Sequence, residues 1–159
     1  MENAEEVIAT PYDMAIIGYG TKTVNRLRLW EASSADGFDL QLFNNMEYTA
    51  AVAKQNSAEN ISRVLYPNDT GPSGKALRLK QQYFFTSASL QDLVRSFIHK
   101  HGTNFADFPR YNVIQLNDTH PVVAIPELMR LLMDEHHLGW DAAWLRMRSS
   151  ETSSAFRRK

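Results

Sequence analysis

The chain has 159 residues, of which 43% are hydrophobic and 22% charged, enough for one ordinary domain with a core. Its 17 basic and 18 acidic residues give a formal net charge of −1, so neither nucleic acid nor a membrane is an expected partner. There is no cysteine, no signal-peptide pattern and no run near the roughly 20 apolar residues of a membrane span, so we expect a cytoplasmic protein without disulfides or thiolate metal sites.

The first third of the chain predicts two extended segments and a helix. Residues 9–13 indicate the end of a strand meeting a turn, and the glycines of 16–20 indicate a loop. Apolar and basic residues alternate over 24–32, which predicts a strand with one wet face. Residues 45–65 are rich in alanine, a strong helix former, and predict a long and poorly buried helix.

Helices and strands alternate in the remainder. Residues 68–74 are all turn formers and predict a loop, and apolar residues at helical spacing predict a helix from about Lys75. Residues 113–116 predict a short buried strand, followed by a turn and by helices that start near Ala124 and Asp141. This alternation predicts an α/β layered fold.

The turn after the strand at 113–116 contains the first candidate site. In open α/β sheets, ligands collect at the carboxyl ends of strands, where loops and helix N-termini converge. Asp118 and His120 are expected there, beside the positive end of the next helix dipole. The alternative is plain helix capping, which is the commoner use of an Asn-Asp-Thr sequence before a helix.

The loop at 68–74 contains the second candidate site. Asn68 and Asp69 offer the amide and carboxylate groups that bind sugar hydroxyls, although a solvated turn is the simpler interpretation. The pair His136-His137 lies at a predicted helix end and lacks further ligands, so no metal site is expected. Residues 18–20 lack the third glycine of a dinucleotide fingerprint.

Several blocks of the chain resemble the α-glucan phosphorylase family, in the family's order and spacing. They are RLW at 28–30, AENISRVLYPND at 58–69, LRLKQQYF at 77–84, IQLNDTHP at 114–121 and AIPELMR at 124–130. The resemblance runs from about Val7 to Trp144. Over this range the chain resembles an internal part of the N-terminal half of a glycogen, starch or maltodextrin phosphorylase.

The resemblance implies a fold, a reaction and a cofactor. Family members have two Rossmann-like halves of the glycosyltransferase type called GT-B. They transfer the terminal α-1,4-linked glucose of a glucan to orthophosphate and release glucose 1-phosphate. Pyridoxal phosphate assists, but its lysine belongs to the C-terminal half. We therefore expect residues 1–144 to be a partial N-terminal domain that binds no cofactor, has no catalytic residue of its own and is inactive alone.

The resemblance also assigns roles to residues. Asn68 and Asp69 match the family's gate loop over the sugar cleft, and Asp118 and His120 match residues that line the glucose pocket. The helix from Tyr48 to Ser62 matches the one through which family members form homodimers. Residues 145–159 show no family pattern and are expected to be a disordered tail.

Two departures from the animal enzymes bear on regulation. The gate loop continues with Thr70, Gly71 and Pro72 in place of an asparagine and two aromatics, and the nucleotide-activator position has Arg95 and Ser96 in place of two arginines. Control by adenosine monophosphate is therefore not expected, and a bacterial-type enzyme is favoured. The alternative function is a non-catalytic remnant that binds glucan or dimerises.

Overall fold

The computed structural model describes residues 5–153 of the chain, which divide into two compact units. The first unit ends at Gln81 and the second begins at Gln82. The boundary falls inside one long helix, α4 (Pro72–His101). Among the described residues, strands pair into two separate two-stranded sheets, β1 with β2 and β3 with β4. The predicted mixture of helices and strands is confirmed.

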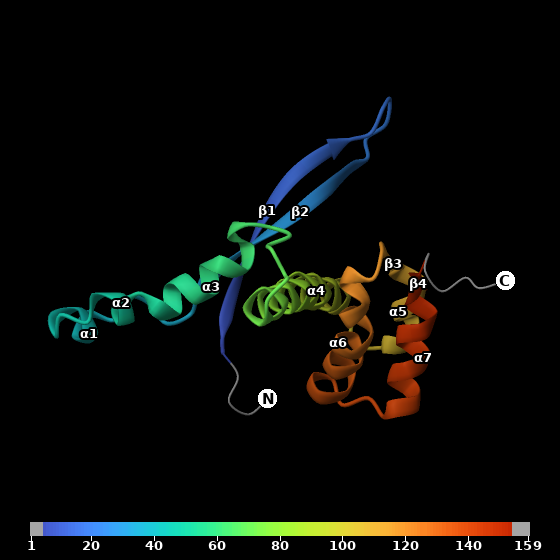
Figure 1. Ribbon diagram of the computed structural model, residues 1–159. Coiled ribbons are helices and arrows are strands. Elements are labelled where there is room, and N and C mark those ends of the chain that lie inside the picture. Colours follow the sequence, from blue (N-terminus) through green and yellow to red (C-terminus); the bar gives the residue numbers. More distant parts are fainter. Residues whose placement is uncertain (1–4, 154–159) are drawn as a thin grey trace. The chain divides into compact units, whose positions relative to one another are not determined.

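The first unit is built on a long antiparallel hairpin of β1 (Val7–Ile17) and β2 (Val24–Ser34), shown in Figure 1. Its register pairs Val7 with Ser34 and Ile17 with Val24. Gly20 has a φ of 63°, a left-handed conformation that glycine adopts without steric cost, in the turn that connects the strands. The strand predicted at 24–32 is confirmed. The strand end predicted at 9–13 is wrong, because β1 continues through Pro11 to Ile17.

Three short helices follow the hairpin: α1 (Leu40–Asn44), α2 (Tyr48–Ala51) and α3 (Ala53–Arg63). The Asp39 carboxylate caps α1 by accepting from the amide of Leu42 at 3.0 Å. Ala58 and Ile61 of α3 are buried, and α3 packs on β2, where the amide of Ala32 donates to Ser62 Oγ at 2.9 Å. The single helix predicted over 45–65 is therefore divided near Val52 into α2 and α3. Most of its buried residues belong to α3.

The second unit contains the larger core. Leu90, Val94 and Phe97 of α4 pack with residues from the segments that follow it. These are η1 (Phe105–Asp107), α5 (Phe108–Tyr111), β3 (Ile114–Leu116), α6 (Ala124–Arg130), η3 (Leu131–Glu135) and α7 (Trp140–Ser150). Between β3 and α6 lies η2 (His120–Val123), which buries no residue. Phe108, Leu128 and Leu132 have no exposed surface. The predicted strand and both predicted helices after it are confirmed.

The end of the described chain differs from the prediction. Helix α7 continues to Ser150, and β4 (Glu151–Ser153) pairs in parallel with β3, beside which it lies in Figure 1. Disorder beginning at Leu145 is thus wrong for residues 145–153. Met147 and Ser150 face the core, so apolar packing and strand pairing order a segment whose sequence has weak periodicity. Residues 154–159 of the predicted tail lie outside the described residues.

Candidate functional site

Asn68 and Asp69 lie in the loop between α3 and α4, in the first unit. The Asn68 side-chain oxygen accepts from the amide of Thr70 at 3.0 Å, which fixes a turn characteristic of asparagine. The Asp69 carboxylate is more than half exposed, with one oxygen 3.8 Å from Arg78 Nε. The predicted loop is confirmed up to Gly71, and α4 begins earlier than expected because Pro72 suits the first turn of a helix.

Asp118 and His120 follow β3 directly, in the second unit. Asp118 has a φ of 66°, an uncommon conformation for a residue with a side chain. Its carboxylate accepts from the amide of Thr119 at 2.6 Å, and its other oxygen lies 4.0 Å from His120 Nδ1. The structure therefore brings Asp118 and His120 together at a strand end, with the Asp118 carboxylate 60% exposed and able to accept from a ligand.

The capping interpretation of this turn finds limited support. The residue in the cap position of η2 is Thr119, whose side chain makes no capping hydrogen bond. Asp118 accepts from the adjacent amide rather than from the amides two or three positions into the helix, as a capping side chain does. Left-handed backbone also occurs at Met46, Tyr66 and His137, and aspartate adopts it more readily than most residues, so it does not single out Asp118 by itself. The Asp118 carboxylate does not cap η2 in the usual way, and its role in binding stays a prediction.

A buried polar cluster, which sequence reasoning missed, lies between α4 and α6. Glu127 is 3% exposed and accepts from Ser87 Oγ at 2.6 Å, from the Tyr83 hydroxyl at 3.1 Å, and from Arg130 Nε and Nη2 at 2.8 and 2.9 Å. Burial raises the pKa of Glu127, but hydrogen bonds from Arg130, Ser87 and Tyr83 outweigh it and hold this pKa below its ordinary value. Burial and the neighbouring Glu127 carboxylate raise the pKa of Tyr83.

This cluster stabilises the packing of α6 on α4 and is not a ligand site. Each donor points at the same carboxylate, so Glu127 has little capacity left for a ligand. No sequence signal distinguishes Glu127 from an ordinary acidic residue in the first turn of a helix, where glutamate is common for electrostatic reasons. Only the packing of α6 on α4 reveals that the side chain is buried.

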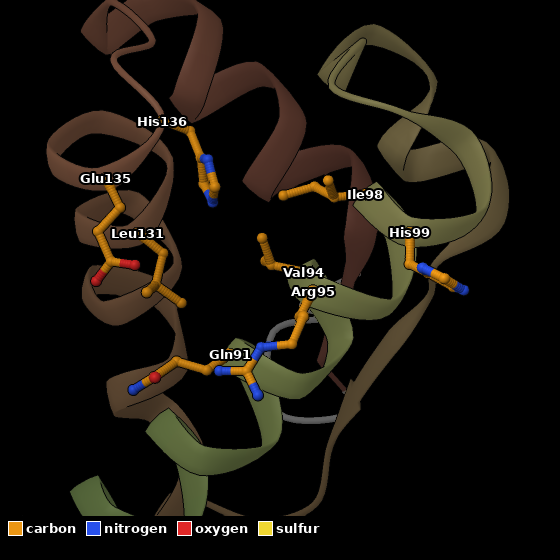
Figure 2. A pocket seen from close by; sticks show the side chains of 8 residues that line it. All are labelled: Gln91, Val94, Arg95, Ile98, His99, Leu131, Glu135 and His136. Carbon is orange, nitrogen blue, oxygen red and sulfur yellow. The ribbon is translucent and has the colours of Figure 1, made fainter.

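A pocket of about 360 Å³ opens elsewhere in the second unit, between α4 and the segment after α6. Figure 2 shows its lining: Gln91, Val94, Arg95, Ile98, His99, Leu131, Glu135 and His136. The His136 ring points into the space, whereas the His99 ring points away. Neither Asp118 nor His120 lines this pocket, so it is separate from the strand-end site. Arg95, which the family resemblance predicts to lie at the nucleotide-activator position, is part of it.

The described residues offer no metal centre and do not fit pyridoxal phosphate. Within residues 5–153, no three His, Asp or Glu side chains gather in a way that could hold a metal ion. Pyridoxal phosphate is held by a lysine in an enclosed pocket. Every described lysine is exposed instead, namely Lys22, Lys54, Lys75, Lys80 and Lys100. Across this same part of the chain, no helix has the length and apolar character needed to span a membrane.

Comparison with known proteins gives concordant matches. The sequence model of the carbohydrate phosphorylase family matches residues 1–153. The chain is 51% identical over 134 residues to a glycogen phosphorylase of Synechocystis, covering 84% of this chain and 16% of that protein. It is 52% identical over 149 residues to the muscle form of glycogen phosphorylase from Mus musculus, covering 89% of this chain and 18% of that protein. The brain form from Homo sapiens is 51% identical with the same coverage.

Two points follow from these matches. The chain spans less than a fifth of the length of these relatives. The cyanobacterial and mammalian relatives are about equally similar to it, so identity does not separate a bacterial-type enzyme from an animal one.

Proposed function

The chain belongs to the carbohydrate phosphorylase family, and we propose that it serves a glycogen phosphorylase by binding the terminal glucose of an α-1,4-glucan. The observation that carries the proposal is the strand-end pair, in which an exposed carboxylate on left-handed backbone lies beside an imidazole. Carboxylate and imidazole groups are suited to the donors and acceptors of sugar hydroxyls. Family membership supplies the class of ligand, and the closeness of Asp118 and His120 at the strand end supports the proposal that they bind it.

The proposed reaction is the phosphorolysis carried out by the complete enzyme. An oxygen of orthophosphate forms a bond to the anomeric carbon of the terminal glucose as the α-1,4 bond breaks. The shortened glucan receives a proton on the departing oxygen, and glucose 1-phosphate leaves. Asp118 and His120 are proposed to hold the sugar by hydrogen bonds, and Asn68 and Asp69 to act from the gate loop. None of the four is proposed to attack the sugar or to transfer the proton.

Pyridoxal phosphate is used by the family, and its binding is not assigned to this chain. In the complete enzyme it supplies the phosphate group that exchanges a proton with the substrate phosphate. The proposal that this chain alone binds no cofactor and is inactive rests on the resemblance, which puts the cofactor lysine in the C-terminal half of the family.

The finer architecture is also part of the proposal. We assign residues 1–144 to the N-terminal half of a GT-B fold. The parallel pairing of β3 with β4, with helices between the two strands in the sequence, is in keeping with such a fold, although β4 lies beyond residue 144. Homodimerisation is assigned to the helix around Tyr48–Ser62. In α3 of that region, Ala58 and Ile61 are covered by the chain's own packing, whereas the neighbouring Lys54, Gln55 and Asn60 are exposed and available to a partner. A cytoplasmic location rests on the family alone.

Titration of the purified chain with maltoheptaose, followed by amide NMR, tests the glucan proposal. We expect signals of the strand-end turn to move in the wild-type chain and to move less in Asp118→Asn and His120→Gln. Asp107→Asn, which alters an acidic side chain in another turn of the second unit, is the matched control. If the sugar moves no signals, or moves them equally in Asp118→Asn and in wild type, the proposed site is wrong. In that case, a molecular mass in solution that rises with protein concentration would favour a non-catalytic remnant that dimerises.

A further inference from the structure

The segment between α3 and α4 lies against one face of α4, and the contacts recur at helical spacing. They involve Gly74, Arg78 and Gln81, which are separated by four and three residues and therefore share a face of the helix. We call these three residues the anchor face. All of their contacts described below lie within the first unit.

Gly74 provides the closest of these contacts. It lies in the first turn of α4, where helical backbone suits any ordinary residue. A Cβ atom at this position would nevertheless collide with the carbonyl oxygen of Asn68 and would lie 2.9 Å from the Cα of Asp69. The backbone of the gate loop therefore rests directly on the helix at the one position that has no side chain.

Arg78, one turn further along, holds the loop through its guanidinium group. Its Nε lies 3.8 Å from a carboxylate oxygen of Asp69, and its central carbon lies 5.1 Å from the centre of the Tyr66 ring. The second distance is within the range of a cation–π interaction. The Arg78 side chain is partly buried, whereas the Asp69 carboxylate is more than half exposed, so the ion pair is screened by water and the ring contact adds a second attachment.

Gln81 completes the face. Its side chain is buried, and its amide nitrogen donates to the carbonyl oxygen of Val64 at 2.7 Å. Successive residues of the loop thus contact successively earlier positions of α4: Val64 contacts Gln81, Tyr66 contacts Arg78, and the Asn68–Asp69 pair contacts Gly74. The segment runs along the helix in the opposite direction and is attached at each turn.

We propose that Gly74 and Arg78 are positioning residues that fix the location of Asn68 and Asp69 against α4. Gly74 permits the close approach of the loop backbone, and Arg78 retains Asp69 and Tyr66. The consequence for sugar binding rests on the proposed function, whereas the anchoring itself depends only on the contacts in this chain. Opening of the loop requires both contacts to separate, so a change at either residue alters how long the loop stays in place.

Hydrogen–deuterium exchange on the full 159-residue chain without sugar tests the anchoring. Gly74→Ala and Arg78→Gln are expected to raise the exchange rate of amides in residues 66–71 by about fivefold or more, because a segment that has lost its contacts opens more often. The matched control is Lys80→Gln, which also removes a cation from α4. The Lys80 ammonium donates to Glu5 at 3.1 Å and not to the loop. Its loop exchange is expected to stay within about twofold of wild type.

The sign of the stability change gives a second readout. Alanine is the better helix former, so Gly74→Ala should raise the melting temperature if the loop contact is absent and lower it if the contact is present. Wild-type loop exchange in folded Gly74→Ala and Arg78→Gln would overturn the proposal, as would equal effects of Arg78→Gln and Lys80→Gln. If Gly74→Ala does not fold, Arg78→Gln and Tyr66→Leu decide the outcome.

Adding maltoheptaose separates this proposal from the proposed function. If both hold, the sugar slows exchange of residues 66–71 in wild type and slows it less in Arg78→Gln. Faster loop exchange in the variants, together with no response to sugar in wild type, would support the anchoring and contradict glucan binding by this chain.

Discussion

Replacing Glu127 with glutamine should destabilise the second unit substantially while leaving its shape unchanged. The substitution keeps the volume of the side chain but removes the charge that accepts from Arg130, Ser87 and Tyr83. Removing one partner of a buried ion pair costs about 3–5 kcal/mol. Arg130 is 22% exposed and also donates to Glu135 at 2.9 Å, so it retains a partner. We therefore expect a loss of about 2–3 kcal/mol in the free energy of unfolding.

Urea denaturation followed by circular dichroism measures this loss. With a typical slope of about 1–3 kcal/mol per molar urea, the midpoint should fall by roughly 1 M or more. Glu135→Gln is the matched control, because it removes the second carboxylate of Arg130 from a position that is 48% exposed. An exposed pair contributes about 0–1 kcal/mol, so the control should stay near wild type. The reasoning is refuted if Glu127→Gln unfolds at the wild-type midpoint, or if both variants lose the same free energy.

Four further predictions concern pH, the site, the core and activity. The pKa of Glu127 in the folded chain lies below its ordinary value, so the ionised carboxylate stabilises the fold fully above about pH 4.3. This stabilisation is lost as the pH falls through the folded pKa. In urea titrations, wild type should therefore lose more stability than Glu127→Gln between pH 5 and about 3. In a complete enzyme with this sequence, Asp118→Ala and His120→Ala should lower kcat/KM by roughly 10- to 100-fold with little change in melting temperature, and the reverse pattern would indicate capping. Leu128→Ala, at a site with no exposed surface, should cost about 2–5 kcal/mol in the same urea assay, whereas a loss below 1 kcal/mol would mean that the core closes over the cavity. Finally, the purified chain should release no glucose 1-phosphate from glycogen and phosphate, and measurable release would contradict the assignment of catalysis to residues outside it.

Local patterns in the sequence predicted most elements whose faces differ in polarity. Alternation of apolar and basic residues located β2, and an apolar run followed by turn formers located β3 and the turn with Asp118. The proline at the start of α6 and the turn formers before α4 also act locally, which is why those boundaries were nearly right. The site residues Asn68 and Asp118 came from the family resemblance as much as from pattern, since capping and solvated turns have the same residue types.

Strand β1, the divided helix and the final strand could not be predicted in the same way. Pro11 argues against a strand by itself, yet it lies in β1 opposite Trp30, because a proline is tolerated where its missing donor is not needed by a neighbouring strand. Residues 151–153 have no pattern of their own and become a strand through pairing with β3. Non-local pairing of this kind depends on residues far apart in the sequence, which local propensity does not register.

The sequence by itself determined the family, the order of most elements and the residue types available at the strand-end turn. Those features depend on composition, spacing and short-range backbone preference, all of which are written in neighbouring residues. Only the tertiary structure decided that the Glu127 carboxylate is buried among three donors and that the loop of Asn68 rests on Gly74. The Glu127 contacts depend on how closely two helices that are distant in sequence approach, and that distance is set by the packing of whole elements. The Asn68–Gly74 contact is local in sequence, but it depends on the path that the loop takes back along α4, which residue types alone do not determine.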